Sequence, residues 1–177
     1  MSTTLSTQEL HNALFADENT SAYAVLDGAS IIDLLPQLNE LGAPHQCLFA
    51  GKLHPEVVQT APYLVALEGD HPFTTWVLRN GWGKHWGIFA LAPADLNFRD
   101  VRKHLRTFLR VRSPEGAPLF FRYYDPRVLR VFLPTCDNSE HAQIFGPLSA
   151  YIMEGDDDEL LQFRGEIPSQ MAGEQSP

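Results

Sequence analysis

Cysteine is scarce in this sequence, with two residues, Cys47 and Cys136, in a chain of 177. Two cysteines placed so far apart are too few for a disulfide framework or a zinc site. No apolar run approaches the roughly 18 residues of a membrane-spanning helix, and the N-terminus lacks the basic and apolar segments of a signal peptide. We therefore expect a reduced, cytoplasmic protein with no membrane partner.

Catalytic motifs are also missing. The sequence has no G-x-S-x-G nucleophile elbow, no Walker A or G-x-G-x-x-G phosphate loop, and no H-E-x-x-H or C-x-x-C pair. The seven histidines are scattered without the spacing of metal ligands. Cys47 lies on an expected buried strand, where a cysteine is a small core residue. We expect no catalytic residue, no cofactor and no metal.

The charge is acidic overall, with 13 basic and 22 acidic residues and a net charge of −9. This net negative charge argues against a protein that coats nucleic acid nonspecifically. Residues 99–130 reverse it, with nine basic residues against three acidic ones. Such a block is either a solvated face balanced by acidic neighbours or a docking surface for an acidic partner.

Strands alternate with helices through most of the chain. We expect helices over residues 6–16, 30–41, 56–60, 72–80, 95–110, 126–133 and 137–145, and strands over 22–27, 45–50, 63–67, 86–91, 119–124, 149–153 and 160–164. Ser6 and Asp125 are placed to cap helices, as is Ser30 with Asp33, and either Asp137 or Ser139 could cap the helix that ends near residue 145. The alternation predicts an α/β fold, a mixed sheet flanked by helices in a single compact domain with a C-terminal hairpin.

The division expected along the chain is an N-terminal helix within 1–21, a folded domain over 22–164 and a polar tail over 165–177. The tail lacks periodicity, so we expect it to be disordered. Pro36 falls inside the helix expected over 30–41 and should kink it or shorten its first part.

The segment 95–110 has the clearest helical pattern. An apolar stripe on one face is formed by Phe98, Val101, Leu105, Phe108 and Leu109. A basic ridge beside it is formed by Arg99, Arg102, Lys103, Arg106 and Arg110. The stripe should pack on the core while the ridge stays at the surface. We predict that Arg102, Lys103 and Arg106 bind a partner, and that reversing their charge abolishes binding without unfolding the chain.

Two further segments are candidates for partner binding. Trp82-Gly-Lys-His-Trp-Gly87 is either a tight aromatic turn before a core strand or an exposed surface, with Trp82 and Trp86 as contact residues. Arg122, Asp125 and Arg127 surround a strand-to-helix corner. Asp125 as a helix cap with an arginine partner is a sufficient structural reason for that corner, and partner binding is the alternative.

Several segments, read in order, resemble one family. They are Tyr23-Ala-Val-Leu-Asp27, Leu48-Phe-Ala-Gly51, Ala61-Pro-Tyr-Leu-Val65, Trp82–Gly87, His104-Leu-Arg106, Phe121-Arg-Tyr-Tyr-Asp-Pro-Arg-Val128, Leu133-Pro134 and Phe145-Gly-Pro147. This set resembles the effector-adaptor (chaperone) proteins of bacterial type VI secretion, first catalogued as a domain of unknown function. The likeness covers about residues 22–155.

The resemblance implies a cytoplasmic, non-enzymatic protein that binds a toxic effector and helps load it onto the secretion spike. The spike is a valine-glycine-repeat trimer, often with a proline-alanine-alanine-arginine-repeat tip. Many members carry a further helical lobe after this domain, and this chain stops soon after the hairpin. A minimal adaptor, or one that needs a co-adaptor, is therefore expected.

Two other classes remain open from the residues alone. One is a small enzyme that uses the Arg122, Asp125 and Arg127 corner with His104, for which a deep pocket holding His104 beside Asp125 would be evidence. The other is a nucleic-acid-binding module built on 99–130. The net charge of −9 and the lack of a recognised motif weaken it, so we expect no nucleic-acid partner.

Overall fold

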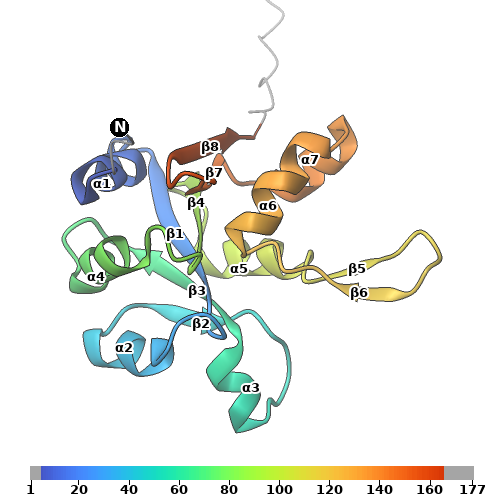
Figure 1. Ribbon diagram of the computed structural model, residues 1–177, viewed down its shortest axis with the longest axis horizontal. Helices are drawn as coiled ribbons and strands as arrows, with labels where there is room; N and C mark the ends of the chain where they lie inside the picture. Colours follow the sequence, from blue (N-terminus) through green and yellow to red (C-terminus); the bar gives the residue numbers. More distant parts are fainter. Residues whose placement is uncertain (1–4, 166–177) are drawn as a thin grey trace, which may run out of the picture.

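A six-stranded sheet forms the centre of the molecule, with strand order β2-β3-β1-β4-β7-β8 (Figure 1). The computed structural model describes residues 5–165, so the tail expected over 165–177 lies, apart from Gly165, outside the described residues. The strands are β1 (Thr20–Asp27), β2 (His45–Cys47), β3 (Pro62–Leu67), β4 (Gly87–Pro93), β7 (Ala150–Glu154) and β8 (Leu160–Arg164). The α/β class, the flanking helices and the terminal hairpin β7–β8 are confirmed.

Every pairing within this sheet is antiparallel, although the alternation of strands and helices suggested a mixed sheet. Two of the helical connections, from β1 to β2 and from β3 to β4, skip a strand. β1 and β2 run in the same direction with β3 between them, and β3 and β4 run in the same direction with β1 between them. These two crossovers join strands that are parallel but are not neighbours. The connections from β2 to β3 and from β4 to β7 also contain helices, and they join antiparallel neighbours.

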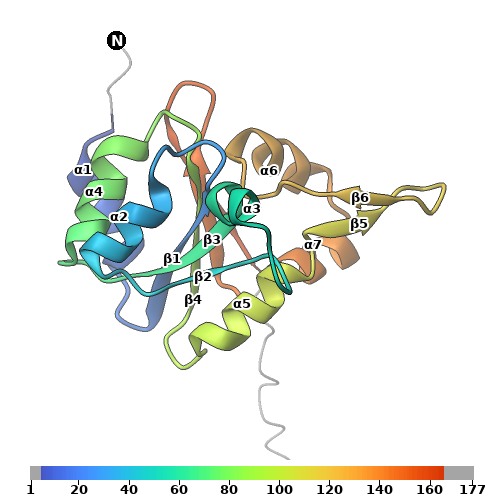
Figure 2. The same cartoon turned by 90° about the horizontal axis from the view of Figure 1, so that it is seen from below.

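Helices cover both faces of the sheet (Figure 2). One layer contains α1 (Thr7–Phe15), α2 (Leu34–Leu41) and α4 (Pro72–Gly81), and the other contains α5 (Phe98–Arg106), α6 (Pro126–Phe132) and α7 (Asn138–Phe145). Side chains of β1 alternate between the two cores: Leu26 packs with the first layer and Val25 with the second. Because both faces are covered, residues 22–27 are all buried.

Helix caps follow the sequence closely, with one exception. Ser6 and Asp137 both form complete capping boxes, and Asp125 caps α6. The cap expected from Ser30 and Asp33 is wrong, because the Ser30 hydroxyl instead donates to the Asp27 carboxylate. Asp33 makes no side-chain cap bond and α2 begins after it. Pro36 thus lies in the first turn, which shortens the helix as expected.

Four expected elements differ in extent. The strand expected over 45–50 is three residues long, and α3 (Pro55–Thr60) follows it at the end of the sheet. The helix expected over 95–110 ends at Arg106, so Arg110 belongs to a strand, β5 (Arg110–Arg112). The strand expected over 119–124 is β6 (Pro118–Phe120), outside the main sheet. The segment Pro126–Thr135 is α6 continued by a 3₁₀ turn, η1 (Leu133–Thr135).

The β5–β6 hairpin, which we call the arm, extends away from the body of the molecule (Figures 1 and 2). Arg110 pairs with Phe120 and Arg112 with Pro118. The turn begins with the Ser113-Pro-Glu-Gly116 segment, in which Gly116 adopts a φ of +84°. Glycine adopts this left-handed conformation without strain. The turn that connects the two strands of the arm therefore depends on Gly116 and not on packing against the rest of the molecule.

Candidate functional site

Three buried carboxylates gather where β1, β7 and α6 meet, and we call this region the polar end. Asp27 is the last residue of β1, Glu154 is the last residue of β7, and Asp125 is the N-cap of α6. β1 and β7 both pair antiparallel with β4, so they run in the same direction and end at the same edge. All three acids are less than 10% exposed. A buried charge is costly unless it is paired and hydrogen-bonded.

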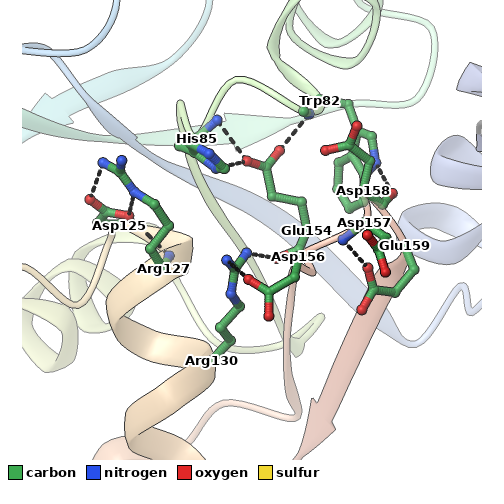
Figure 3. A network of polar contacts seen from close by, with 11 residues as sticks. Trp82, His85, Asp125, Arg127, Arg130, Glu154, Asp156, Asp157, Asp158 and Glu159 are labelled. Carbon is green, nitrogen blue, oxygen red and sulfur yellow. Dashed lines mark hydrogen bonds and ion pairs between the residues drawn. The ribbon is translucent and has the colours of Figure 1, made fainter.

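The Trp82–Gly87 segment wraps around the Glu154 carboxylate (Figure 3). The backbone N–H groups of Gly83 and His85 each donate to it at 2.6 Å. The His85 ring nitrogen Nδ1 also faces this carboxylate, forming an ion pair when the ring is protonated. Gly83 and His85 both have positive φ, and their N–H groups, on either side of Lys84, point at the same anion. The segment therefore holds a carboxylate of its own chain.

Both tryptophans of this segment pack on the core. The Trp82 indole N–H donates to the Asp158 carbonyl at 2.7 Å and its ring stacks on Phe89. The Trp86 ring lies 5.0 Å from that of Trp76. A Cβ at Gly81 would come within 2.8 Å of the Trp86 ring, so this close approach requires glycine. Of the two readings left open by the sequence, this geometry is that of the aromatic turn before a core strand.

Arg122 pairs with the buried Asp27. Its guanidinium donates to Asp27 Oδ2 at 2.6 Å and lies over the Tyr124 ring. Asp27 Oδ1 accepts from the backbone N–H of Ala29 at 2.9 Å, which closes the turn after β1. Burial opposes the charge on Arg122, but Asp27 and Tyr124 together outweigh it and raise the pKa of the guanidinium. Arg122 thus fixes the chain before α6 to the sheet.

Asp125 and Arg127 form a two-pronged ion pair at the start of α6. Arg127 donates through Nε at 3.0 Å and Nη2 at 2.8 Å. Burial would raise the pKa of Asp125, but hydrogen bonds from Arg127 lower it. The carboxylates of Asp125 and, more weakly, Glu154 and Asp27 raise the pKa of Arg127. Arg130 completes the polar end by donating to the Glu154 carbonyl at 3.0 Å and pairing with Asp156 (Figure 3).

His104 does not lie at the corner formed by Arg122, Asp125 and Arg127. Its Nε2 lies 3.0 Å from the Ile144 carbonyl, and its ring fills the space where a Cβ on Gly146 would be. Burial lowers its pKa. None of the hollows found over residues 5–165 is lined by both His104 and Asp125. Within the same residues, no His, Cys, Asp and Glu side chains are grouped to hold a metal ion.

On α5, Arg102 of the basic ridge braces the fold, whereas Arg99, Lys103 and Arg106 form no ion pair within residues 5–165. Arg102 donates to the Cys47 carbonyl through two nitrogens, at 3.0 and 2.7 Å, and so ties α5 to β2. Burial, with repulsion from Arg106, lowers its pKa. Arg99, Arg102, Lys103, Arg106 and Thr107 line a hollow of about 440 Å³. Charge reversal at Arg102 would break a structural contact, so Lys103 and Arg106 are the better probes of binding.

The arm carries apolar side chains that the fold leaves uncovered. Val111, Leu119 and Phe120 are 38, 50 and 48% exposed. A hollow of about 430 Å³ lies on one side of the arm, lined partly by Phe121, Phe132 and Ile144. Another of about 500 Å³ lies on the other side, against Phe49 and Leu53. Exposed apolar residues beside concave surfaces are typical of protein-binding sites.

Sequence reasoning missed the arm because it assigned residues 119–124 to a covered strand of the sheet. The signal that could have found it is Ser113-Pro-Glu-Gly116, a turn sequence between two short strand-forming segments. Two such segments form a hairpin with each other before they can join a distant sheet. Leu119 and Phe120 then belong to an exposed ribbon.

Fold and surface together define an α/β domain with helices on both faces and an exposed apolar arm. Residues 22–143 match the family described as a domain of unknown function, DUF4123, and the chain belongs to this family. No curated protein and no solved structure matches the chain. Over residues 5–165, no helix is long and apolar enough to cross a membrane.

Proposed function

We propose that this protein is a cytoplasmic adaptor that binds a toxic effector of a type VI secretion system and helps load it onto the spike. The observation that carries this proposal is the arm, whose apolar side chains are exposed between two hollows. Its support from the sequence is the ordered set of motifs over 22–155, a range that contains the whole DUF4123 match at 22–143. The partner is a protein cargo, with the spike or a co-adaptor as further partners.

The polar end supports this proposal indirectly. Arg122, Asp125 and Arg127 bond to each other or to Asp27, and Trp82 and Trp86 pack on the core. These residues stabilise the domain that holds the arm in place. Of the residues predicted to bind a partner, Lys103 and Arg106 on α5 have no such structural role within residues 5–165, and the arm adds exposed apolar side chains beside them.

The test is co-expression of the tagged protein with the product of the neighbouring effector gene, followed by size-exclusion chromatography. We expect one stable complex, lost when the N-terminal part of the effector is deleted. An arm-shortened variant, in which residues 110–120 are replaced by a two-residue turn, should fail to form it. The matched control is Ile32→Ser, which changes an apolar residue that is 89% exposed on another part of the surface. Two folded proteins that elute separately would overturn the proposal.

A further inference from the structure

A groove between the arm and the segment that leads into α3 combines apolar and basic walls. Phe49, Leu53 and Val57 form one side, and Phe120 of β6 meets it in an edge-to-face contact with Phe49, with ring centroids 5.5 Å apart. Arg110 stands directly across the ribbon from Phe120. Paired residues share a face of a two-stranded sheet, so a positive charge lies beside an apolar contact surface.

The positive charges of this groove are not balanced locally. Within residues 5–165, neither Arg106 nor Arg110 forms an ion pair, and neither this groove nor the adjoining basic hollow is lined by an acidic residue. Of the nearby acids, Asp100 accepts a hydrogen bond from Asn97, and Glu56 on α3 lies 4.0 Å from His54 Nδ1. A basic surface inside an acidic chain attracts an anion.

The groove continues into the basic hollow on α5. Arg106 lines both, so the two surfaces meet at its guanidinium. Arg102 bonds to the carbonyl of Cys47, the residue before the segment that forms the apolar wall. The apolar wall and the basic helix are therefore fixed to each other. An extended chain lying in the groove would pass from an apolar surface to a row of cations.

We propose that this groove binds an extended acidic segment of the cargo, with one aliphatic or aromatic side chain against Phe49 and Phe120 and carboxylates against Arg106 and Arg110. An apolar anchor beside charge pairs gives both affinity and fast association. The identity of the partner as cargo rests on the proposed function. The peptide chemistry rests on the groove alone.

The experiment is selection of a phage-displayed random peptide library on the full chain. We expect enrichment of peptides that carry Asp or Glu next to a large apolar residue. Fluorescence anisotropy with an enriched peptide should then show about tenfold weaker binding for Arg106→Glu/Arg110→Glu and for Phe120→Ser. Higher salt should weaken binding to the wild-type chain.

Two control variants match these changes elsewhere on the surface. Arg79→Glu reverses an exposed charge on α4, in the other helix layer, and Ile32→Ser removes an exposed apolar side chain. Both should bind the peptide as the wild type does. The neutral variant Arg106→Gln/Arg110→Gln, checked by circular dichroism, separates loss of charge from loss of fold.

Enrichment of basic or uncharged peptides, or no enrichment, would overturn the proposal. Binding of labelled DNA that is lost in Arg106→Glu/Arg110→Glu would also overturn it, because the surface would then be a nucleic-acid site. If the effector co-purifies equally with the wild type and this variant, the groove is not the cargo site while the adaptor function stands. If acidic peptides are selected but no effector co-purifies, the groove chemistry stands and the adaptor function fails.

Discussion

The polar end and the arm differ in whether their charged side chains form ion pairs within the chain. At the polar end, the carboxylates of Asp27, Asp125 and Glu154 each have a basic partner within the chain. On and beside the arm, Arg106 and Arg110 have no such partner among residues 5–165. Internal pairing satisfies buried charge and stabilises the fold, whereas unpaired surface charge costs the fold little and is available to another molecule. The comparison separates residues that hold the domain from residues that can bind.

The largest effect on stability should come from Glu154→Ala. The change leaves the N–H groups of Gly83 and His85 without their acceptor, so we expect the free energy of unfolding to fall by about 3 kcal/mol. Urea denaturation followed by tryptophan fluorescence measures it. Glu18→Ala, at an exposed loop position, is the control and should change the value by less than about 0.5 kcal/mol. Equal effects would show that Glu154 does not hold the loop.

A smaller and graded effect should distinguish the two aspartates of the polar end. Asp27→Asn weakens a charge-assisted bond from Arg122 at a buried site and should cost about 2 kcal/mol. Asp125→Asn should cost about 1 kcal/mol, because asparagine also caps helices and Arg127 is 54% exposed. Both changes are isosteric, and thermal or urea unfolding compares them. The reverse order would contradict the assignment of Asp27 as the main anchor.

Shortening the arm should affect binding far more than stability. Leu109 and Phe121 are joined by a backbone hydrogen bond of 2.9 Å at the base of the arm, so a two-residue turn can replace residues 110–120. The Phe49–Phe120 contact would be lost, and we expect the free energy of unfolding to fall by about 1 kcal/mol. Urea denaturation checks this value. A cost similar to that of Glu154→Ala would show that the arm is part of the core.

The smallest expected effect is a change in how the free energy of unfolding depends on pH. Burial lowers the pKa of His104 in the folded chain, so in mildly acidic solution the unfolded chain binds more protons at this position. Stability therefore falls as the pH drops below about 6.5, the ordinary histidine value. In His104→Gln this part of the fall should disappear, whatever the variant does to stability at neutral pH. Unfolding curves over a pH series measure the slope, and an unchanged slope would mean that another group titrates.

Much of the local structure could be predicted from the sequence. Capping residues such as Ser6 and Asp137 mark helix starts because their side chains satisfy backbone N–H groups within a few residues. The apolar stripe on 95–110 predicted that Val101 and Leu105 are buried, because residues three or four positions apart lie on the same face of a helix. The predicted end of this helix was wrong. Leu109 is buried although it lies after the last helical residue, and an apolar residue in the sequence does not show whether its backbone is helical.

The candidate site could be predicted only in part. Asp125 was expected as a helix cap with an arginine partner, and the structure gives this role to Arg127, two residues further along the chain. The role of Glu154 could not be found, since it depends on hydrogen bonds from residues about 70 positions earlier. Arg102 was placed on a surface ridge, and its bond to Cys47 depends on how α5 lies against β2. The arm was missed because the sequence pattern of a strand does not show which other strand it pairs with.

The sequence by itself determined where most helices and strands form, which helix carries a basic ridge, and the family of the chain. These follow from contacts between residues close in sequence, and from motifs that are read in order. Only the tertiary structure decided that two of the crossovers skip a strand, that two tryptophans pack on the core, and that Phe120 and Arg110 line an open groove. Those outcomes depend on contacts between distant segments, whose choice is a property of the whole packed chain.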